Sequence, residues 1–335
     1  MRVAVFGAYG HTGRFVVAEL RERGYEPLPL GRDAGKLATV FPEGERRVAS
    51  VDDPGSLDRA LAGVAAVVNC AGPFASTTGP LIEAALRAGI PYVDVAAEIE
   101  ANRDTFAHYA ERAEAAGVAV VPAMAFFGGL GDLLVTAAMG DWTAADEAHV
   151  AYGLSSWHPT AGTVASGVVS RERRDGRRVR FTDGRLVYAD GDLPRLDWDF
   201  PAPLGVRPVL GEFTMADVVT VPSHLDIPEV RTYMTADAAR DLAAGDAPAA
   251  VDERGRSTQT FTVDVVVRAG DVRRRMVAHG QDIYAVSAPL AVEATHRVLT
   301  GQTRVKGVAS AGRIFDAPDF LRALSDHLTV RSLAA

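Results

Sequence analysis

Apolar residues in the first part of the chain follow two alternating patterns. Up to about residue 140, short apolar runs without a helical period alternate with longer stretches in which apolar residues recur at helical spacing. The short runs predict six strands, over residues 2–6, 26–30, 46–50, 65–69, 92–95 and 118–121. The longer stretches predict helices, most clearly over residues 78–88 and 102–116. This alternation is typical of a parallel sheet that helices cover on both faces.

A different pattern begins near Glu147, where turn dipeptides separate strand-like runs. The dipeptides are Asp175–Gly176, Asp183–Gly184 and Gly270–Asp271. The runs beside the second and third turns are residues 179–181, 186–188, 260–267 and 272–277. This spacing predicts antiparallel hairpins. Helical spacing returns over residues 288–300 and 318–328, and we expect part of this last segment to pack back on the first domain.

A glycine turn follows the first predicted strand directly. A pyrophosphate needs bare backbone N–H groups at a helix N-terminus, so the order of buried strand, glycine turn and amphipathic helix suits a dinucleotide. Glycine is frequent in this chain, with 32 residues, so the alternative interpretation is that these glycines only form a turn. The flanking strand and helix favour the dinucleotide site. We expect the cofactor contacts from Gly7, Tyr9, Gly10, His11, Thr12 and Gly13.

The residues after the second predicted strand indicate which cofactor binds. A site for NAD usually carries a carboxylate there, whereas this chain has Arg32, with Lys36 one helical turn later. A guanidinium forms a planar, charge-assisted fork onto a phosphate, so the sequence favours NADP(H). The alternative for Arg32 is a surface arginine beside a loop, and Asp33 is best explained as a helix N-cap. Asp52 borders the adenine pocket or, with its neighbour Asp53, begins a helix.

Composition limits the class of protein and its partners. A chain of 335 residues with 48% hydrophobic content can bury two ordinary cores. Its net charge of -8 argues against nucleic acid or an anionic membrane as the main partner, and a small-molecule substrate is expected instead. The single cysteine, Cys70, fits a reducing compartment, so we expect a cytoplasmic protein. These observations leave a homodimer open.

A second glycine-containing loop, residues 69–74, follows the fourth predicted strand, where a dinucleotide-binding chain passes beneath the nicotinamide. Together with residues 7–14, 31–37 and 92–98, this loop resembles the saccharopine-dehydrogenase-like reductase family, which includes trans-acting enoyl reductase-like members. Residues 125–132, the small residues near Gly162 and residues 288–290 also resemble family members. The resemblance places Asn69, Ala71, Gly72 and Pro73 at the cofactor.

The resemblance implies an NADP(H)-binding Rossmann domain, a doubly wound parallel sheet, joined to a second α+β domain that contains an antiparallel sheet. We expect the first domain over residues 1–140 and a domain for substrate binding or dimerisation over residues 141–285. A C-terminal helical segment would cover residues 286–335. The chain departs from the commoner family pattern at Gly131, where serine is usual, and at Ala96 and Ala97, which replace small polar residues.

Three residues are candidates for catalysis, and each has a structural alternative. Glu98 follows the fifth strand at the carboxyl edge of the sheet, where ligands of open α/β folds bind, but it also suits a helix N-terminus. His158 could donate a proton from the domain junction or be a structural histidine. Asp132 ends the glycine-rich loop and could equally be a helix N-cap.

Other chemistries lack their motifs. The sequence has no CxxC or HExxH spacing for a metal, no GxSxG nucleophile elbow and no Tyr-xxx-Lys pair. The arginine-rich residues 171–180 suggest an anionic partner, although the interleaved acids favour a solvated edge. The sequence therefore predicts an NADP(H)-dependent reductase that transfers hydride to a C=N or an activated C=C bond of a small biosynthetic intermediate. A protein that binds NADPH without turnover, as a sensor or assembly partner, is the alternative.

Overall fold

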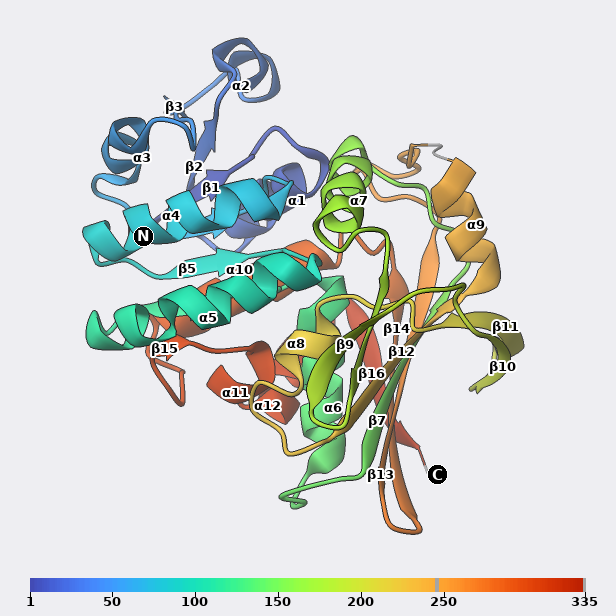
Figure 1. The fold of residues 1–335 in the computed structure, drawn as a ribbon. Coiled ribbons are helices and arrows are strands. Elements are labelled where there is room, and N and C mark those ends of the chain that lie inside the picture. The colour runs from blue at the N-terminus through green and yellow to red at the C-terminus, as the bar shows by residue number, and fades with distance from the viewer. Residues whose placement is uncertain (245–246, 334–335) are drawn as a thin grey trace.

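The computed structural model describes residues 1–244 and 247–333, and its strands form two sheets that lie side by side with helices between them (Figure 1). The first sheet is parallel, in the order β15-β6-β5-β4-β1-β2-β3. Six of these strands are those that the apolar runs predict: β1 (Arg2–Phe6), β2 (Glu26–Gly31), β3 (Arg47–Val48), β4 (Ala66–Asn69), β5 (Tyr92–Asp94) and β6 (Ala119–Val121). The order from β3 to β6 is that of a dinucleotide-binding sheet.

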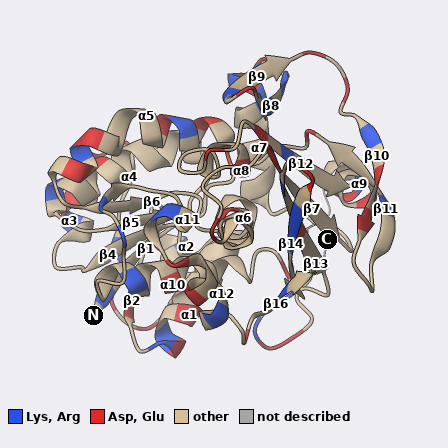
Figure 2. Cartoon of the chain, turned by 90° about the horizontal axis from the view of Figure 1, so that it is seen from below, with Lys and Arg blue, Asp and Glu red and all other residues tan. Residues whose placement is uncertain are grey.

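Helices cover both faces of this sheet because its central strands are apolar on both sides. Val3 and Val5 of β1 point into one core, whereas Ala4 and Phe6 point into the other. Such two-sided burial is what a continuous apolar run predicts. The helices that connect these strands are α1 (His11–Glu22), α2 (Ala34–Val40), α3 (Pro54–Leu61), α4 (Phe74–Ala88) and α5 (Ile99–Ala115). In Figure 2, α4 and α5 carry charges of both signs on the outer surface.

The second sheet is mixed and mostly antiparallel. Its main path runs β10-β11-β12-β7-β13-β14-β16, and β8 joins it through β12. These strands are β7 (Glu147–Leu154), β8 (Arg178–Thr182), β9 (Arg185–Ala189), β10 (Arg195–Phe200), β11 (Gly205–Gly211), β12 (Glu229–Thr235), β13 (Thr260–Ala269), β14 (Val272–Gln281) and β16 (Leu328–Leu333). The hairpins predicted at Gly184 and Gly270 form as β8–β9 and β13–β14. The predicted fold class is therefore confirmed.

The other helical segments lie between or beside the sheets. They are an irregular turn η1 (Phe126–Leu130), α6 (Gly131–Met139), α7 (Ala161–Arg173), α8 (Asp217–Thr220), α9 (Ala236–Ala244), α10 (Ser287–Leu299), α11 (Ala311–Ile314) and α12 (Ala317–Ala323). Among these, α6 packs on β13 and β14. No helix in the described part of the chain is long and apolar enough for a membrane span.

Two local predictions were wrong. Asp175 and Gly176 do not join two strands, because helix α7 precedes them and only β8 follows. Thr160 begins that helix, since its side chain accepts a hydrogen bond from the Thr163 N–H. The predicted helix over residues 318–328 ends at Ala323, and β16 begins at Leu328 as the edge strand beside β14.

The C-terminal segment contacts both sheets. Helix α10 packs against α1, where Tyr25 and His296 are hydrogen bonded at 2.8 Å. Strand β15 (Gly307–Val308) then extends the first sheet beside β6, and β16 extends the second. The C-terminal segment therefore contributes one strand to each sheet and so connects the two sheets.

Candidate functional site

A cavity of about 1430 Å³ lies between the two sheets. Its lining comes from the carboxyl ends of β1, β2, β4 and β5 on one side, and from α7 with the segments before β12 and α10 on the other. Sites for a single small ligand usually measure about 300–1,000 Å³. This cavity is large enough for a dinucleotide and a second molecule.

The glycine loop forms one wall, and its geometry needs glycine at two positions. Gly7 has a positive φ of 79°, and a Cβ there would lie 2.8 Å from the Ala71 Cβ. A Cβ on Gly13 would collide with the Gly7 carbonyl oxygen and lie 2.9 Å from the Ala8 Cα. Helix α1 begins after Gly10 and has no side-chain cap within the described residues, so its first N–H groups are open to an anion.

His11 and Thr12 also line the cavity, and His11 connects the loop to the opposite wall. Its ring packs edge-on against Phe15 of α1 and Tyr284, with centroids 5.3 Å apart in each case. The Tyr284 hydroxyl accepts hydrogen bonds from the Trp157 indole at 3.1 Å and the Thr160 N–H at 3.3 Å. Burial raises the pKa of this hydroxyl. Through these contacts Tyr284 connects the glycine loop, the start of α7 and the segment that precedes α10.

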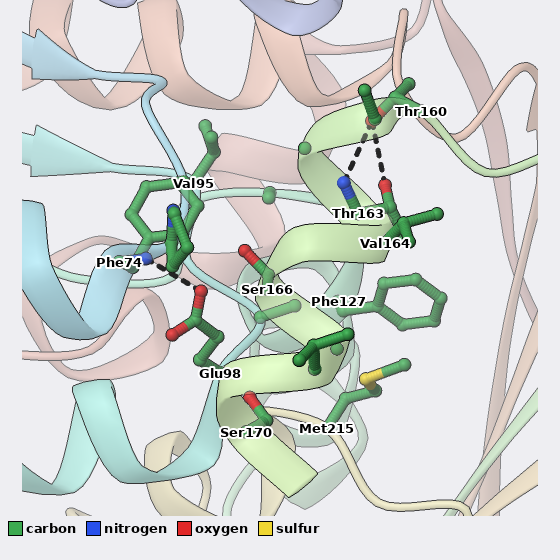
Figure 3. Close-up of a pocket in the computed structure, with 18 of the residues that line it drawn as sticks. Phe74, Val95, Glu98, Phe127, Thr160, Thr163, Val164, Ser166, Ser170 and Met215 are labelled. Atoms are coloured by element: carbon green, nitrogen blue, oxygen red, sulfur yellow. Dashed lines mark hydrogen bonds between the residues drawn. The ribbon is translucent and has the colours of Figure 1, made fainter. Parts of the chain in front are cut away.

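Sequence patterns missed Tyr284 because it lies far along the chain and belongs to no short motif. Its hydroxyl also lies 3.0 Å from the Thr163 Oγ1, which in turn lies 2.9 Å from the Thr160 Oγ1. Only the fold brings these hydroxyl groups together at the start of α7 (Figure 3 shows Thr160 and Thr163).

The carboxyl end of β2 places Arg32 in the cavity wall. The guanidinium has no ion-pair partner among the described residues, and the Tyr9 ring fills the space that a side chain on Gly31 would occupy. Lys36 is outside the lining, with its Nζ 6.0 Å from the Tyr9 ring centroid. Asp33 is the N-cap of α2, since its carboxylate accepts the Lys36 N–H at 3.0 Å.

The two acids after β3 have different roles. Asp53 begins α3, because its carboxylate accepts the Ser56 N–H at 3.1 Å. Asp52 lines the cavity near the end of β3 and accepts a hydrogen bond from the Ser50 hydroxyl at 3.2 Å. The helix-start function therefore belongs to Asp53 and leaves the Asp52 carboxylate at the cavity.

The loop after β4 forms the floor of the cavity. Ala71, Gly72 and Pro73 line it, whereas Asn69 is fully buried behind them. The Asn69 amide holds the loop by accepting the Ala71 N–H at 3.0 Å and donating to the Tyr92 hydroxyl at 3.1 Å. Asn69 therefore shapes the cavity from behind its surface.

Glu98 lines the cavity and is 6% exposed. Its two carboxylate oxygens accept the backbone N–H groups of Phe74 at 2.7 Å, the bond drawn in Figure 3, and of Ala75 at 2.9 Å. These N–H groups are the first of α4, so the carboxylate satisfies that helix N-terminus and fixes the loop before it. Glu98 therefore has the structural role considered above, that of a carboxylate at a helix N-terminus. The helix is α4, and not α5, which follows Glu98 in the chain.

Asp94 at the end of β5 is fully buried beneath this part of the site. Burial raises the pKa of its carboxyl to about 6, although the Ala96 and Ala123 N–H groups and the Tyr92 hydroxyl donate hydrogen bonds to it. These bonds tie the ends of β5 and β6 together. Asp94 lies within residues 92–98, one of the segments that carry the family resemblance.

The other two catalytic candidates do not line the cavity. Asp132 is fully buried in α6, where it accepts the Gly312 N–H at 2.7 Å and is hydrogen bonded to the His224 ring at 2.7 Å. His158 follows Trp157, which is part of the lining. The structure therefore brings Glu98, but neither of these residues, to the predicted nicotinamide position.

The departure from the family pattern at Gly131 has a local cause. A Cβ on Gly131 would collide with the Asp217 carboxylate and lie 3.0 Å from the Tyr152 hydroxyl. Asp217 is fully buried and accepts the Tyr152 hydroxyl at 2.8 Å, and burial raises the pKa of its carboxyl to about 6. Glycine at position 131 makes room for this buried pair.

The wall opposite the loop is mainly apolar. Phe127 and Met215 lie on one side of α7, and Phe74 and Glu98 lie on the other (Figure 3). Phe74, Phe126 and Phe127 all reach the lining while remaining buried, so they belong to the core and to the cavity at once. The exposed Val164 on α7 adds apolar surface to the site, although no sequence motif marks it.

Comparison with known proteins shows that the N-terminal part is similar to one family. Residues 3–121 match the saccharopine dehydrogenase NADP binding domain model. A probable mitochondrial saccharopine dehydrogenase-like oxidoreductase from Arabidopsis thaliana is 30% identical over 142 residues, and a saccharopine dehydrogenase-like oxidoreductase from Bos taurus is 27% identical over 145. These alignments cover 37% of this chain and about a third of each relative, at 31% and 34%.

A solved structure resembles the whole chain in fold. It is the apo histidine-tagged saccharopine dehydrogenase (L-Glu forming) from Saccharomyces cerevisiae, with a TM-score of 0.67 and 11% identity. The superposition covers 99% of this chain and 100% of the yeast chain. At this identity the likeness shows that both sheets follow the same overall fold, and it confirms the architecture that the resemblance implied.

Proposed function

Because residues 3–121 match the saccharopine dehydrogenase NADP binding domain model, we propose that this chain is an NADP(H)-dependent reductase of a small biosynthetic intermediate. Its target would be a C=N or an activated C=C bond. The observation that carries the proposal is a single cavity that holds the open α1 N-terminus, the Arg32 guanidinium and the apolar wall of the second half. The relatives named as oxidoreductases support the same class of reaction.

The residues present fit the cofactor. The Gly13 position leaves no room for a Cβ, so α1 approaches β1 closely enough for its N–H groups to meet a diphosphate. Arg32 at the end of β2 suits the ribose 2′-phosphate, which distinguishes NADP(H) from NAD(H). Ala71, Gly72 and Pro73 would lie beneath the nicotinamide end.

When bound, the nicotinamide supplies the hydride, and the protein supplies position and a dry cleft. Glu98 acts in this scheme as a positioning residue, since both of its oxygens hold the start of α4. Asp94 holds the neighbouring strand ends in the same way. A protonated imine already carries the charge that attracts a hydride and needs no acid, whereas a conjugated C=C bond needs a donor or a polarised carbonyl.

An absorbance assay at the nicotinamide band tests the proposal. Purified protein is mixed with NADPH and two panels, amines paired with keto acids and enoyl thioesters. Consumption of NADPH with either panel, and its loss in Gly13→Ala, supports the reductase and identifies the reacting bond. Tight NADPH binding without turnover in both panels contradicts it and favours a sensor or assembly protein.

A further inference from the structure

Four arginines line a part of the cavity that the cofactor residues do not occupy: Arg171, Arg174, Arg177 and Arg178. Helix α7 runs from the end of the cavity where the nicotinamide is expected to the part that these arginines line. In the middle of this helix, the Ser166 Oγ would lie 2.6 Å from a Cβ on Gly72. At its end, Arg173 pairs with Asp104 of α5 at 2.5 Å. Arg171 and Arg174 come five and eight residues after Ser166, about 8 and 12 Å along the helix axis, so they lie about half a helix length beyond the nicotinamide loop.

Acids neutralise only some of these arginines. Arg177 pairs with Asp175 at 3.3 Å, and Arg178 pairs with Glu212 at 3.0 Å. Arg171 and Arg174 form no ion pair or side-chain hydrogen bond within residues 1–244 and 247–333, and they lie about one helical turn apart. Two guanidinium groups thus remain available at this end of the cavity. Figure 2 shows further positive charge on the neighbouring strands β8 and β9.

Acidic side chains also face this region, and they limit what it can bind. Glu172 and Asp192 line the cavity near the arginines, and both are exposed to solvent. The C-terminal end of a helix itself disfavours an anion. An anion at this position would therefore depend on the two free guanidinium groups, so removing them should have a large effect.

Between the nicotinamide loop and the arginines, α7 presents an apolar row to the cavity beside the small polar side chains of Ser166 and Ser170. Val164 and Val168 of α7 line the cavity and are 48% and 52% exposed, which is unusual for valine in a packed helix. Phe127 and Met215 face the same space (Figure 3). A molecule lying along α7 would meet apolar side chains first and charged ones at its far end.

We propose that the substrate is an elongated molecule with an apolar body and an anionic end, a carboxylate or a phosphate ester, which Arg171 and Arg174 bind. The proposal rests on the reductase function and specifies the class of substrate. Its reacting bond lies at the nicotinamide, and its charged end lies at the C-terminal end of α7. A planar guanidinium binds a carboxylate and a phosphate ester in the same way, so the experiment below distinguishes these two anions.

Calorimetric titration of protein saturated with NADPH tests this inference. Saturation fills the phosphate sites of the cofactor, so that a probe reports only the remaining cavity. The probes are octyl phosphate, octanoate and the neutral 1-octanol. We expect Arg171→Gln/Arg174→Gln to weaken the preferred anion by about tenfold or more and to leave 1-octanol unchanged. Tighter binding of octyl phosphate indicates a phosphate ester, and tighter binding of octanoate indicates a carboxylate.

Arg195→Gln is the matched control, because Arg195 is an exposed arginine of β10 outside the cavity lining. It should bind all three probes as the unchanged protein does. Equal affinities for both anions in the unchanged protein and the double variant would overturn the inference. So would a failure of both anions to bind to the NADPH-saturated protein. Failure of NADPH to bind in the first step would instead contradict the proposed function.

Discussion

The two walls of the cavity differ in how closely the chain is packed. On the cofactor side, Gly13 has backbone atoms of Gly7 and Ala8 within the space that a Cβ would occupy. On the other side, Gly167 of α7 has nothing within 4 Å of that space, and Val164 beside it is 48% exposed. One wall is fixed by backbone contacts, and the other presents side chains to an open space.

This difference explains what each wall is suited to do. A diphosphate is recognised by backbone N–H groups, whose geometry allows little variation. A variable substrate is recognised by side chains, and a loosely packed helix can change them without disturbing a core. We infer that the cofactor side of the cavity, which contains the glycine loop, determines which cofactor binds, and that α7 determines which substrate binds.

Alanine at the two glycines should give opposite effects on stability. Gly13→Ala should lower the free energy of unfolding by about 1–3 kcal/mol, since the new methyl group has no room. Gly167→Ala should leave it unchanged or raise it by up to about 1 kcal/mol, because the helix gains a better helix former. Denaturant unfolding of both variants measures the difference. Similar losses in both would show that the walls do not differ in packing.

Glu98→Gln tests whether this residue acts through structure. A glutamine retains one acceptor oxygen for the two N–H groups of α4, so stability should fall by about 0.5–2 kcal/mol. Glu111→Gln, an exposed residue on α5, is the control and should change little. If Glu98→Gln left stability intact and removed one limb of the pH–rate profile, Glu98 would be a proton-transfer group.

Asp217→Asn should change stability less than the substitutions above. The change should appear in how the free energy of unfolding depends on pH. A carboxyl whose pKa is raised on folding, here to about 6, holds its proton more tightly in the folded chain. Its stabilising contribution is complete below the unfolded pKa, about 3.9, and is lost as the pH rises through about 6. Asparagine still accepts the Tyr152 hydroxyl and does not titrate.

We therefore expect the free energy of unfolding of the unchanged protein to increase relative to that of Asp217→Asn as the pH falls from 8 to 5. Asp94, whose pKa is also raised to about 6, and the histidines whose pKa is lowered by burial are the same in both proteins, so their contributions cancel in this difference. Unfolding curves at several pH values measure both slopes. Identical slopes would show that Asp217 does not take up a proton in this range.

Local patterns predicted the parts of the molecule that depend on local chemistry. The apolar runs identified β1 to β6, and the spacing of Gly7, Gly10 and Gly13 predicted the turn between β1 and α1. Asp33 was recognised as an N-cap because its partner is three residues away. Such features need only a few neighbouring residues.

The remaining features depend on contacts between distant segments. Tyr284 meets Trp157 and Thr160 only after the C-terminal segment folds back, and β16 forms only because β14 offers an edge. The arginines after Val169 were interpreted as a solvated edge, since no local pattern shows that α7 borders a cavity. Side chains brought together by folding leave no spacing for a sequence pattern to detect.

The claim that Arg32, on the cofactor side of the cavity, selects NADP(H) is tested most directly by calorimetric titration of NADPH and NADH into the unchanged protein and Arg32→Ala. We predict that NADPH binds more tightly than NADH to the unchanged protein. We also predict that the substitution weakens NADPH binding by about 1–3 kcal/mol, the range for a lost hydrogen bond to a charged group, and leaves NADH nearly unaffected. Equal losses for both cofactors, or no heat with either, would contradict the account.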